Sequence, residues 1–317
     1  ENQVNHEEND DYTYSTSSVV YITLNSNSIS VSGSGVMVSG TTATINAVGT
    51  YSISGTLENG QIIIDTINDG TVKLILNQAS ITSSTNPAIF ISNSEKTVII
   101  LAENTQNFLS DSITNTGNGT LYSKDDLTIC GKGTLTVTGN SNDAIRCNDG
   151  LIIKDANIIV DSVDDGIIGK DYIIIRGATI SINSTGDGFK SDNDEDADRG
   201  YINIETATIT ITSAKGDGIA AQTDLLINSG TFTITTGTAL TTANSDISTK
   251  ALKGSINLII DGGIFNINSL DDALHSNGTI IINGGTFEVS TKDDAIHADT
   301  YLEINGGSFN ITTCYEG

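Results

Sequence analysis

The chain has 317 residues, and 39 aspartates and glutamates against 14 lysines and arginines give it a formal net charge of −25. Such a chain is a poor partner for nucleic acid or an anionic membrane surface, because both bind clustered positive charge. No apolar run reaches the ~18 residues of a membrane-spanning helix, so no direct membrane insertion is expected. The abundance of threonine, isoleucine, asparagine and glycine favours strands and turns over helices.

In chain order, residues 1–18 are polar and acidic, which is typical of a flexible leader. Residues 19–48 are expected to cap the first repeat of a single domain that spans residues 19–317, since an exposed sheet end invites aggregation. Short segments that alternate apolar and polar residues follow from residue 51 onward.

A repeat of about 22 residues governs the rest of the chain, with loop insertions expected at residues 191–200 and 242–253. Residues 256–275 read INLIIDGGIFNINSLDDALH, and residues 278–297 read GTIIINGGTFEVSTKDDAIH. Each repeat contains a strand, a glycine turn, a second strand, an acidic turn and a short third strand. The pattern predicts an all-β parallel β-helix with three strands per coil, in which equivalent residues stack about 4.8 Å apart. An antiparallel sandwich would not require one residue class at one offset in successive repeats.

Aspartates recur after the second strand of each repeat, and Thr238 interrupts their row. Capping of turns explains a single aspartate, but stacked carboxylates repel one another and asparagine would cap equally well. Because protein cations are few, we expect several Ca²⁺ ions, which prefer oxygen ligands. The small residues that follow, such as Gly188 and Gly218, are expected to leave a shallow surface. The candidate metal ligands in the row are Asp143, Asp164, Asp165, Asp187, Asp217, Asp271, Asp272, Asp293 and Asp294.

The insertion at residues 191–200 adds three further candidates, Asp192, Asp194 and Asp196. Their alternation resembles the ligand spacing of a calcium loop, but the glycine and the glutamate of an EF-hand are missing. A solvated acidic loop is the alternative interpretation.

Candidate substrate-binding residues lie beside the row. Lys190, His275 and His297 occupy outward positions on third strands, although a surface role without a ligand is the alternative. Tyr172 and Tyr201 fall on adjacent repeats and could form a stacking platform for sugar rings, or could cover the edge of a strand.

The motifs GDGFKSDNDEDADRGY at residues 186–201 and DDALHSNGTIIINGGTF at residues 271–287 resemble a family of secreted carbohydrate-binding domains from cellulose-degrading clostridia, described as polysaccharide-lyase-like. The resemblance runs from about residue 40 to residue 317. It implies a right-handed parallel β-helix, bound calcium, and binding of cellulose and acidic plant polysaccharides such as polygalacturonate. It also implies a secreted protein at the bacterial cell surface.

Together these patterns predict a monomeric, calcium-dependent polysaccharide-binding module that is not an enzyme. The first alternative is a calcium-dependent pectate-lyase-type enzyme, for which Lys190 is the candidate base. Neighbouring carboxylates should raise the pKa of this lysine, which opposes that role. The second alternative is a structural cell-surface spacer whose calcium only holds the repeats together.

Overall fold

The structure, a computed structural model, describes residues 5–240 and 247–315, so part of the predicted insertion at 242–253 lies outside the described residues. The chain divides into two compact units, residues 4–160 and residues 161–317. No helix in the described part of the chain is long and apolar enough to cross a membrane.

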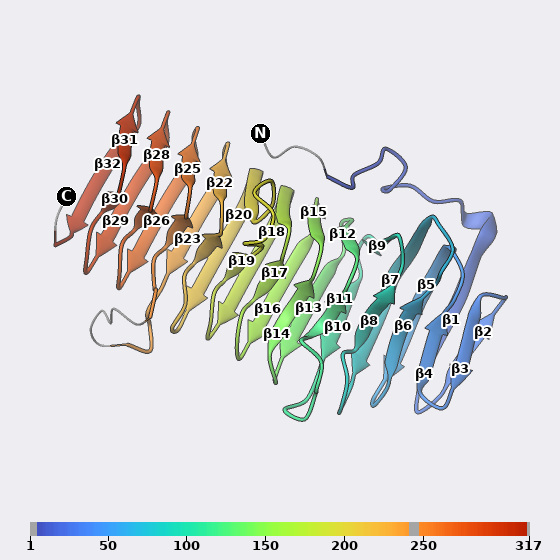
Figure 1. Cartoon of the computed structure of the whole chain (residues 1–317). Helices are drawn as coiled ribbons and strands as arrows, with labels where there is room; N and C mark the ends of the chain where they lie inside the picture. The colour runs from blue at the N-terminus through green and yellow to red at the C-terminus, as the bar shows by residue number, and fades with distance from the viewer. Residues whose placement is uncertain (1–4, 241–246, 316–317) are drawn as a thin grey trace. The chain divides into compact units, whose positions relative to one another are not determined.

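The unit of residues 4–160 begins with a short 3-10 helix, η1 (Thr16–Ser18), and contains two sheets (Figure 1). Its larger sheet holds β1 (Val19–Ser26), β2 (Ile29–Ser32), β5 (Gly49–Leu57), β7 (Thr71–Thr82), β9 (Lys96–Leu101), β10 (Gln106–Ser110), β12 (Asp126–Cys130), β13 (Thr134–Gly139), β15 (Gly150–Lys154) and β16 (Asn157–Ser162). Its smaller sheet holds β3 (Val36–Ser39), β4 (Thr42–Ile45), β6 (Gln61–Asp65), β8 (Ile89–Asn93), β11 (Gly119–Ser123) and β14 (Asp143–Cys147).

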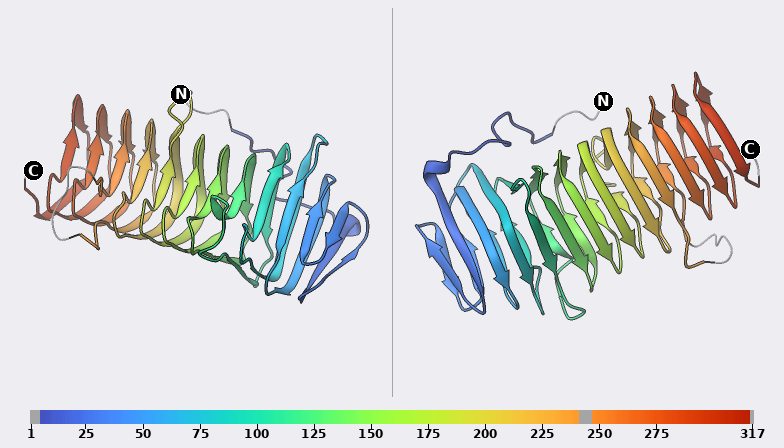
Figure 2. Two further views of the ribbon diagram at one scale, coloured as in Figure 1. Left: turned by 60° about the horizontal axis from the view of Figure 1, so that its bottom comes forward. Right: turned by 180° about the vertical axis from the view of Figure 1, so that it is seen from behind.

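The unit of residues 161–317 repeats this arrangement, and its strands stack in chain order (Figure 2). Its larger sheet holds β18 (Tyr172–Ser184), β20 (Tyr201–Ser213), β22 (Asp224–Ile227), β23 (Thr231–Thr235), β25 (Asn257–Ile260), β26 (Ile264–Ser269), β28 (Thr279–Ile282), β29 (Thr286–Thr291), β31 (Tyr301–Ile304) and β32 (Ser308–Thr313). Its smaller sheet holds β17 (Ile167–Gly169), β19 (Phe189–Ser191), β21 (Ile219–Ala221), β24 (Leu252–Gly254), β27 (Leu274–Ser276) and β30 (Ile296–Ala298).

The all-β prediction is confirmed, but the predicted fold class, a right-handed parallel β-helix with three strands per coil, is wrong as stated. The strands of each unit form two sheets and not three, because long strands such as β7, β18 and β20 run through both the first and the second predicted strand. In addition, β1 pairs antiparallel with β2 and β3 with β4, so the region predicted as a cap consists of two antiparallel pairs.

From β5 onward, the strand pairs whose register is known within each unit are parallel and join equivalent positions of successive repeats. In the second unit, for example, Phe232 pairs with Phe265 and Phe265 with Phe287. The three rings are buried and stacked, with centroids 4.7 and 4.6 Å apart. The sequence repeat therefore stacks like residues on like along the core.

Residues ahead of β1, predicted as a flexible leader, contact the larger sheet of their own unit. The Lys96 Nζ lies 2.8 Å from Asp11 Oδ1, and the His6 Nδ1 lies 3.0 Å from Asp126 Oδ1. The Tyr12 ring lies under the amine of Lys154 at 3.8 Å and packs against the apolar cluster that includes Ile100 and Cys130.

Candidate functional site

The row of aspartates in the second unit lies just before the strands of its smaller sheet. Those strands pair in parallel, so the carboxylates of successive repeats follow one another. The Oδ1 of Asp165 accepts a hydrogen bond from the backbone N–H of Asp187 at 2.6 Å, and the Oδ1 of Asp187 accepts one from that of Asp217 at 2.7 Å. The Oδ1 of Asp272 likewise accepts from the N–H of Asp294 at 3.1 Å. Each of these carboxylates therefore caps the turn of the next repeat.

A lysine, and not Thr238, occupies the position between Asp217 and Asp272. The backbone N–H of Lys250 donates to Asp217 Oδ1 at 2.7 Å, and Leu252 and Lys253 pair with Leu274 and His275. The third strand of this repeat, β24, thus starts at Leu252, inside the segment predicted as the insertion 242–253. The sequence KALK at residues 250–253 matches DALH at residues 272–275, a signal that the sequence analysis missed.

Protein cations lie directly along the row, so the expectation that they are too few to neutralise it is wrong here. The Lys190 Nζ lies 3.1 Å from Asp165 Oδ2 and 3.3 Å from Asp187 Oδ2. The Lys250 Nζ lies 2.5 Å from Asp271 Oδ2. In the other unit, Arg146 and Asp143 form the corresponding ion pair at 3.1 Å. Capping and ion pairing together explain much of the row without a metal.

The small residues next to the aspartates serve the core and not a shallow surface, which corrects that expectation. A Cβ on Gly218 would lie 2.5 Å from the Ala251 carbonyl oxygen and 2.6 Å from the Ile234 side chain. A Cβ on Gly188 would lie 2.5 Å from the Gly218 carbonyl oxygen. Glycine is therefore required where successive turns approach each other closely.

A surface pocket of about 360 Å³ opens beside the row. It exists because Ala220 pairs with Lys190 on one side and with Lys253 on the other, so a methyl group separates two long cationic side chains. Asp187 and Asp217 contribute carboxylates to its wall. The pocket thus offers the ammonium groups of Lys190 and Lys253, a third lining lysine, Lys215, and several acceptor oxygens within one cavity.

The charged side chains in this pocket shift one another's pKa values. Burial, and then the charges of Asp217 and Asp165, raise the pKa of Asp187 to about 7. Burial opposes the charge of Lys190, but Asp187 and Asp165 outweigh it and raise the pKa of this lysine above its usual value. Lys190 therefore remains protonated at neutral pH.

These shifts predict a titration near neutral pH. In metal-free protein, Asp187 should titrate in ¹³C carboxyl NMR spectra near pH 7. Since its pKa is higher in the folded than in the unfolded chain, this group should lower the free energy of unfolding as the pH rises from about 4 to about 7. Asp217→Asn should move the titration of Asp187 to lower pH, and Asp261→Asn, on an exposed turn, should not. An Asp187 titration near pH 4 in wild-type protein would contradict the prediction.

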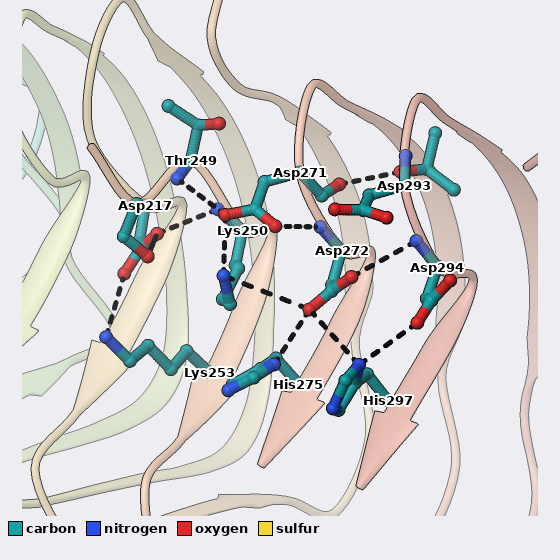
Figure 3. A network of polar contacts seen from close by, with 12 residues as sticks. Asp217, Thr249, Lys250, Lys253, Asp271, Asp272, His275, Asp293, Asp294 and His297 are labelled. Atoms are coloured by element: carbon teal, nitrogen blue, oxygen red, sulfur yellow. Dashed lines mark hydrogen bonds and ion pairs between the residues drawn. The ribbon is translucent and has the colours of Figure 1, made fainter. Parts of the chain in front are cut away.

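Two imidazoles stand at the other end of the row, on β27 and β30 (Figure 3). The His275 Nδ1 lies 2.8 Å from Asp272 Oδ2, and the His297 Nδ1 lies 3.0 Å from Asp294 Oδ2. The pKa of Asp272 is lowered: burial opposes ionisation, but the hydrogen bond with His275 and the charge of Lys250 prevail. These histidines thus lie against the carboxylates.

The structure brings together only some of the predicted metal ligands. In the described part of the second unit, carboxylate oxygens of Asp271, Asp272 and Asp293 lie within 4.8 Å of one another. Burial, and then the charges of the neighbouring aspartates, raise the pKa of Asp293. Asp165, Asp187 and Asp217 do not form such a group in the described part of this unit, and Asp164 is exposed.

The loop at residues 191–200 does not converge on one point. Asp194 and Asp196 are exposed, and neither they nor Asp192 belongs to a group of three close ligand atoms among the described residues. Asn193 organises the loop, since its Oδ1 accepts from the backbone N–H groups of Glu195 and Asp196 at 2.9 and 3.0 Å. A calcium loop built from these three aspartates has no support in this geometry.

Tyr172 and Tyr201 do not form an accessible platform for sugar rings, which corrects that prediction. The rings stack on each other with centroids 5.4 Å apart, but they are only 2% and 1% exposed. Arg199, from the acidic loop, lies over the Tyr172 ring at 5.3 Å. The alternative interpretation, in which these tyrosines are structural, describes them better.

Stacked repeats with a carboxylate row and a charged pocket define an all-β protein with a polar, charged surface. A family model described as carbohydrate-binding domain-containing protein matches residues 39–292 and 278–317. A protein of that description from Acetivibrio thermocellus is 37% identical over 211 residues, which are 64% of this chain and 73% of that protein. The chain therefore belongs to the carbohydrate-binding domain family, and the resemblance predicted from its motifs is confirmed.

A solved structure is similar in fold. It is described as the polysaccharide lyase-like protein from C. thermocellum in a gadolinium derivative, and it matches with a TM-score of 0.65 and 24% identity. The match covers 91% of this chain and 99% of that chain. At this level of identity the likeness concerns the fold alone.

Proposed function

We propose that the protein is a calcium-dependent polysaccharide-binding module that works outside the cell, at the bacterial surface, on cellulose and on acidic glycans such as polygalacturonate. The observation that carries the proposal is the pocket in which Ala220 separates Lys190 from Lys253. Membership of the carbohydrate-binding domain family gives the class of ligand. The paired ammonium groups favour an acidic sugar, because a uronate carboxylate can accept charge-assisted hydrogen bonds from both.

Other polar groups in the pocket can form hydrogen bonds with the hydroxyl groups of a sugar. Asp187 and Asp217 offer acceptors for sugar hydroxyls, and Gln222 and Ser255 add uncharged donors and acceptors. Among the described residues, no aromatic side chain lines the pocket, so recognition through hydrogen bonds and charge is expected in place of ring stacking. Affinity should therefore fall with increasing salt.

Asp271, Asp272 and Asp293 are the residues that fit calcium best. Their donors are all carboxylate oxygens, which is the ligand type that Ca²⁺ prefers, and separations up to 4.8 Å match its flexible shell. The Lys250 amine now lies against Asp271 Oδ2, while the N–H of Lys250 bonds to Asp217 in the pocket wall. Calcium bound by the three aspartates would compete with this amine for Asp271. Because the backbone of the same lysine is bonded to Asp217, calcium binding would be linked to the wall of the pocket.

The chemistry of Lys190 does not support the lyase alternative. A lysine that removes a proton must be neutral, whereas the carboxylates of Asp187 and Asp165 raise the pKa of Lys190. We therefore propose binding without turnover.

Pocket filling tests the proposed function. Ala220→Phe should weaken binding to soluble polygalacturonate, measured by calorimetry with calcium present, by about tenfold or more, because the ring occupies the cavity between the lysines. Thr233→Phe, on an exposed position of β23, is the matched control and should leave affinity unchanged. Equal binding by both variants, or no binding by the wild type, would refute the proposed site. Formation of unsaturated product would favour the lyase.

Chelation tests the calcium dependence separately. Removal of calcium should lower both the melting temperature and the affinity for polygalacturonate, because a ligand bound only by the native state stabilises it. A melting curve and an affinity that chelation leaves unchanged would count against the proposed ion.

A further inference from the structure

The two histidines of the second unit differ from every other residue at their position in the row. The equivalent outward residues of the preceding strands are Lys190, Ala220 and Lys253. A lysine neutralises a carboxylate but cannot ligate a metal while it is protonated, whereas a neutral imidazole can. At His275 and His297 the row therefore gains side chains that can ligate a metal ion.

In both histidines Nδ1 faces the aspartate row and Nε2 faces away from it. The partner of Nε2 indicates whether Nδ1 can bind a metal. The His297 Nε2 lies 3.0 Å from Asp299 Oδ1, and the His275 Nε2 lies 2.8 Å from Asn277 Oδ1. An ionised carboxylate only accepts, so Nε2 of His297 must carry the proton in that contact. Metal-bound histidines are held in the same way, by an acceptor on the ring nitrogen that does not bind the metal.

The Nδ1 of His297 then faces a carboxylate oxygen with a lone pair on each side. The His297 Nδ1 lies 3.0 Å from Asp294 Oδ2 and 4.0 Å from Asp272 Oδ2, and the His275 Nδ1 lies 2.8 Å from Asp272 Oδ2. Two acceptors at such distances require a cation between them, which is either a second proton on the ring or a metal ion.

We propose that His275, His297 and Asp272, with Asp294 beside them, bind one divalent transition-metal ion such as Zn²⁺. The ligand atoms of the first three residues lie within 4.8 Å of one another. A tetrahedral zinc ion with bonds of about 2.1 Å separates its ligands by about 3.4 Å. The distances from Asp272 Oδ2 to His275 Nδ1, 2.8 Å, and to His297 Nδ1, 4.0 Å, lie on either side of that value. Two imidazoles and carboxylates suit zinc better than calcium, which prefers an all-oxygen shell.

The site lies on the other side of Asp272 from Asp271 and Asp293 (Figure 3). It is thus separate from the calcium ligands proposed above, apart from Asp272. The His297 side chain is 40% exposed, so an ion can enter from solvent and keep a water molecule as a further ligand. The inference does not depend on glycan binding.

Calorimetry with ZnCl₂ on untagged, chelator-treated protein tests the proposal, with and without millimolar calcium. Wild-type protein should bind one zinc ion at this site in both conditions, and Co²⁺ should give the visible spectrum of a tetrahedral nitrogen and oxygen site. His275→Gln and His297→Gln should each weaken zinc binding by about 100-fold and remove the cobalt spectrum. His6→Gln, which changes the remaining histidine of the chain, should change neither.

Several results would overturn the site. These are the absence of zinc binding, full displacement of zinc by calcium, and equal affinity in the three histidine variants. Far-ultraviolet circular dichroism shows whether each variant folds. If His275→Gln does not fold, His297→Gln at the more exposed position decides the question.

Discussion

Phe265→Ala should lower the free energy of unfolding of the second unit by about 3–5 kcal/mol. The Phe265 ring is 1% exposed and lies between the rings of Phe232 and Phe287, at centroid distances of 4.7 and 4.6 Å. Alanine would remove the contacts on both faces and leave a cavity between rigid strands that cannot collapse into it. Chemical denaturation, followed by near-ultraviolet circular dichroism, measures the loss.

Phe309→Ala is the matched control for this variant. Phe309 has the same position in its repeat and stacks on Phe287 at 4.6 Å, but it is only half-buried. Phe309→Ala should therefore lower the free energy of unfolding clearly less than Phe265→Ala does. Equal losses in the two variants would show that stacking between repeats does not dominate the stability of this core.

The sequence repeat predicted the stacking of the core and the order of most of the aspartate row. Its period fixes which residues pair, because a shift by one residue would turn every apolar side chain outward. The repeat could not predict how strands merge into sheets. That depends on whether the strand continues through the turn with only a shift of register, as in β18 and β20, or is broken, as between β22 and β23.

The sequence was less informative about the site because an insertion of arbitrary length hides the register. The segment that follows β23 and includes residues 241–246 moved Lys250 and Lys253 away from the expected spacing, although their sequence context matches that of Asp272 and His275. The alternation along the strands predicts that Tyr172 and Tyr201 point outward, and this was equally misleading: both rings are buried, and Arg199 of the acidic loop at residues 191–200 lies over the Tyr172 ring. Parity describes the direction of a side chain, not what covers it.

The position of each cation along the row determines what the neighbouring carboxylates can bind. Lys190 and Lys253 reach outward and flank the pocket, where they can contact a ligand. Lys250 lies in the row itself, with its amine directed at Asp271 and Asp272. The same residue type is thus a proposed ligand contact at two positions and an internal counterion at the third.

Lys250→Met should therefore destabilise the second unit, by on the order of 3 kcal/mol in calcium-free buffer at pH 7. The Lys250 side chain is 14% exposed, and its Nζ lies 2.5 Å from Asp271 Oδ2 and 3.8 Å from Asp272 Oδ2. Its removal leaves clustered carboxylates without their nearest cation. Chemical denaturation at several pH values, with and without calcium, measures the effect.

The pH dependence and the calcium dependence of this loss identify its cause. Lys250 helps to lower the pKa of Asp272 in the folded protein, so its contribution is present above the unfolded pKa of about 4 and is lost as the pH falls through the folded pKa. The difference between variant and wild type should accordingly shrink in acid, and millimolar calcium should restore stability at pH 7 by replacing the amine. Lys253→Met is the control, since the Lys253 Nζ lies 3.6 Å from the single carboxylate of Asp217 and its side chain is 27% exposed. This variant should lose only about 1 kcal/mol of the free energy of unfolding. A Lys250→Met variant as stable as wild type without calcium would show that capping hydrogen bonds alone hold these carboxylates together.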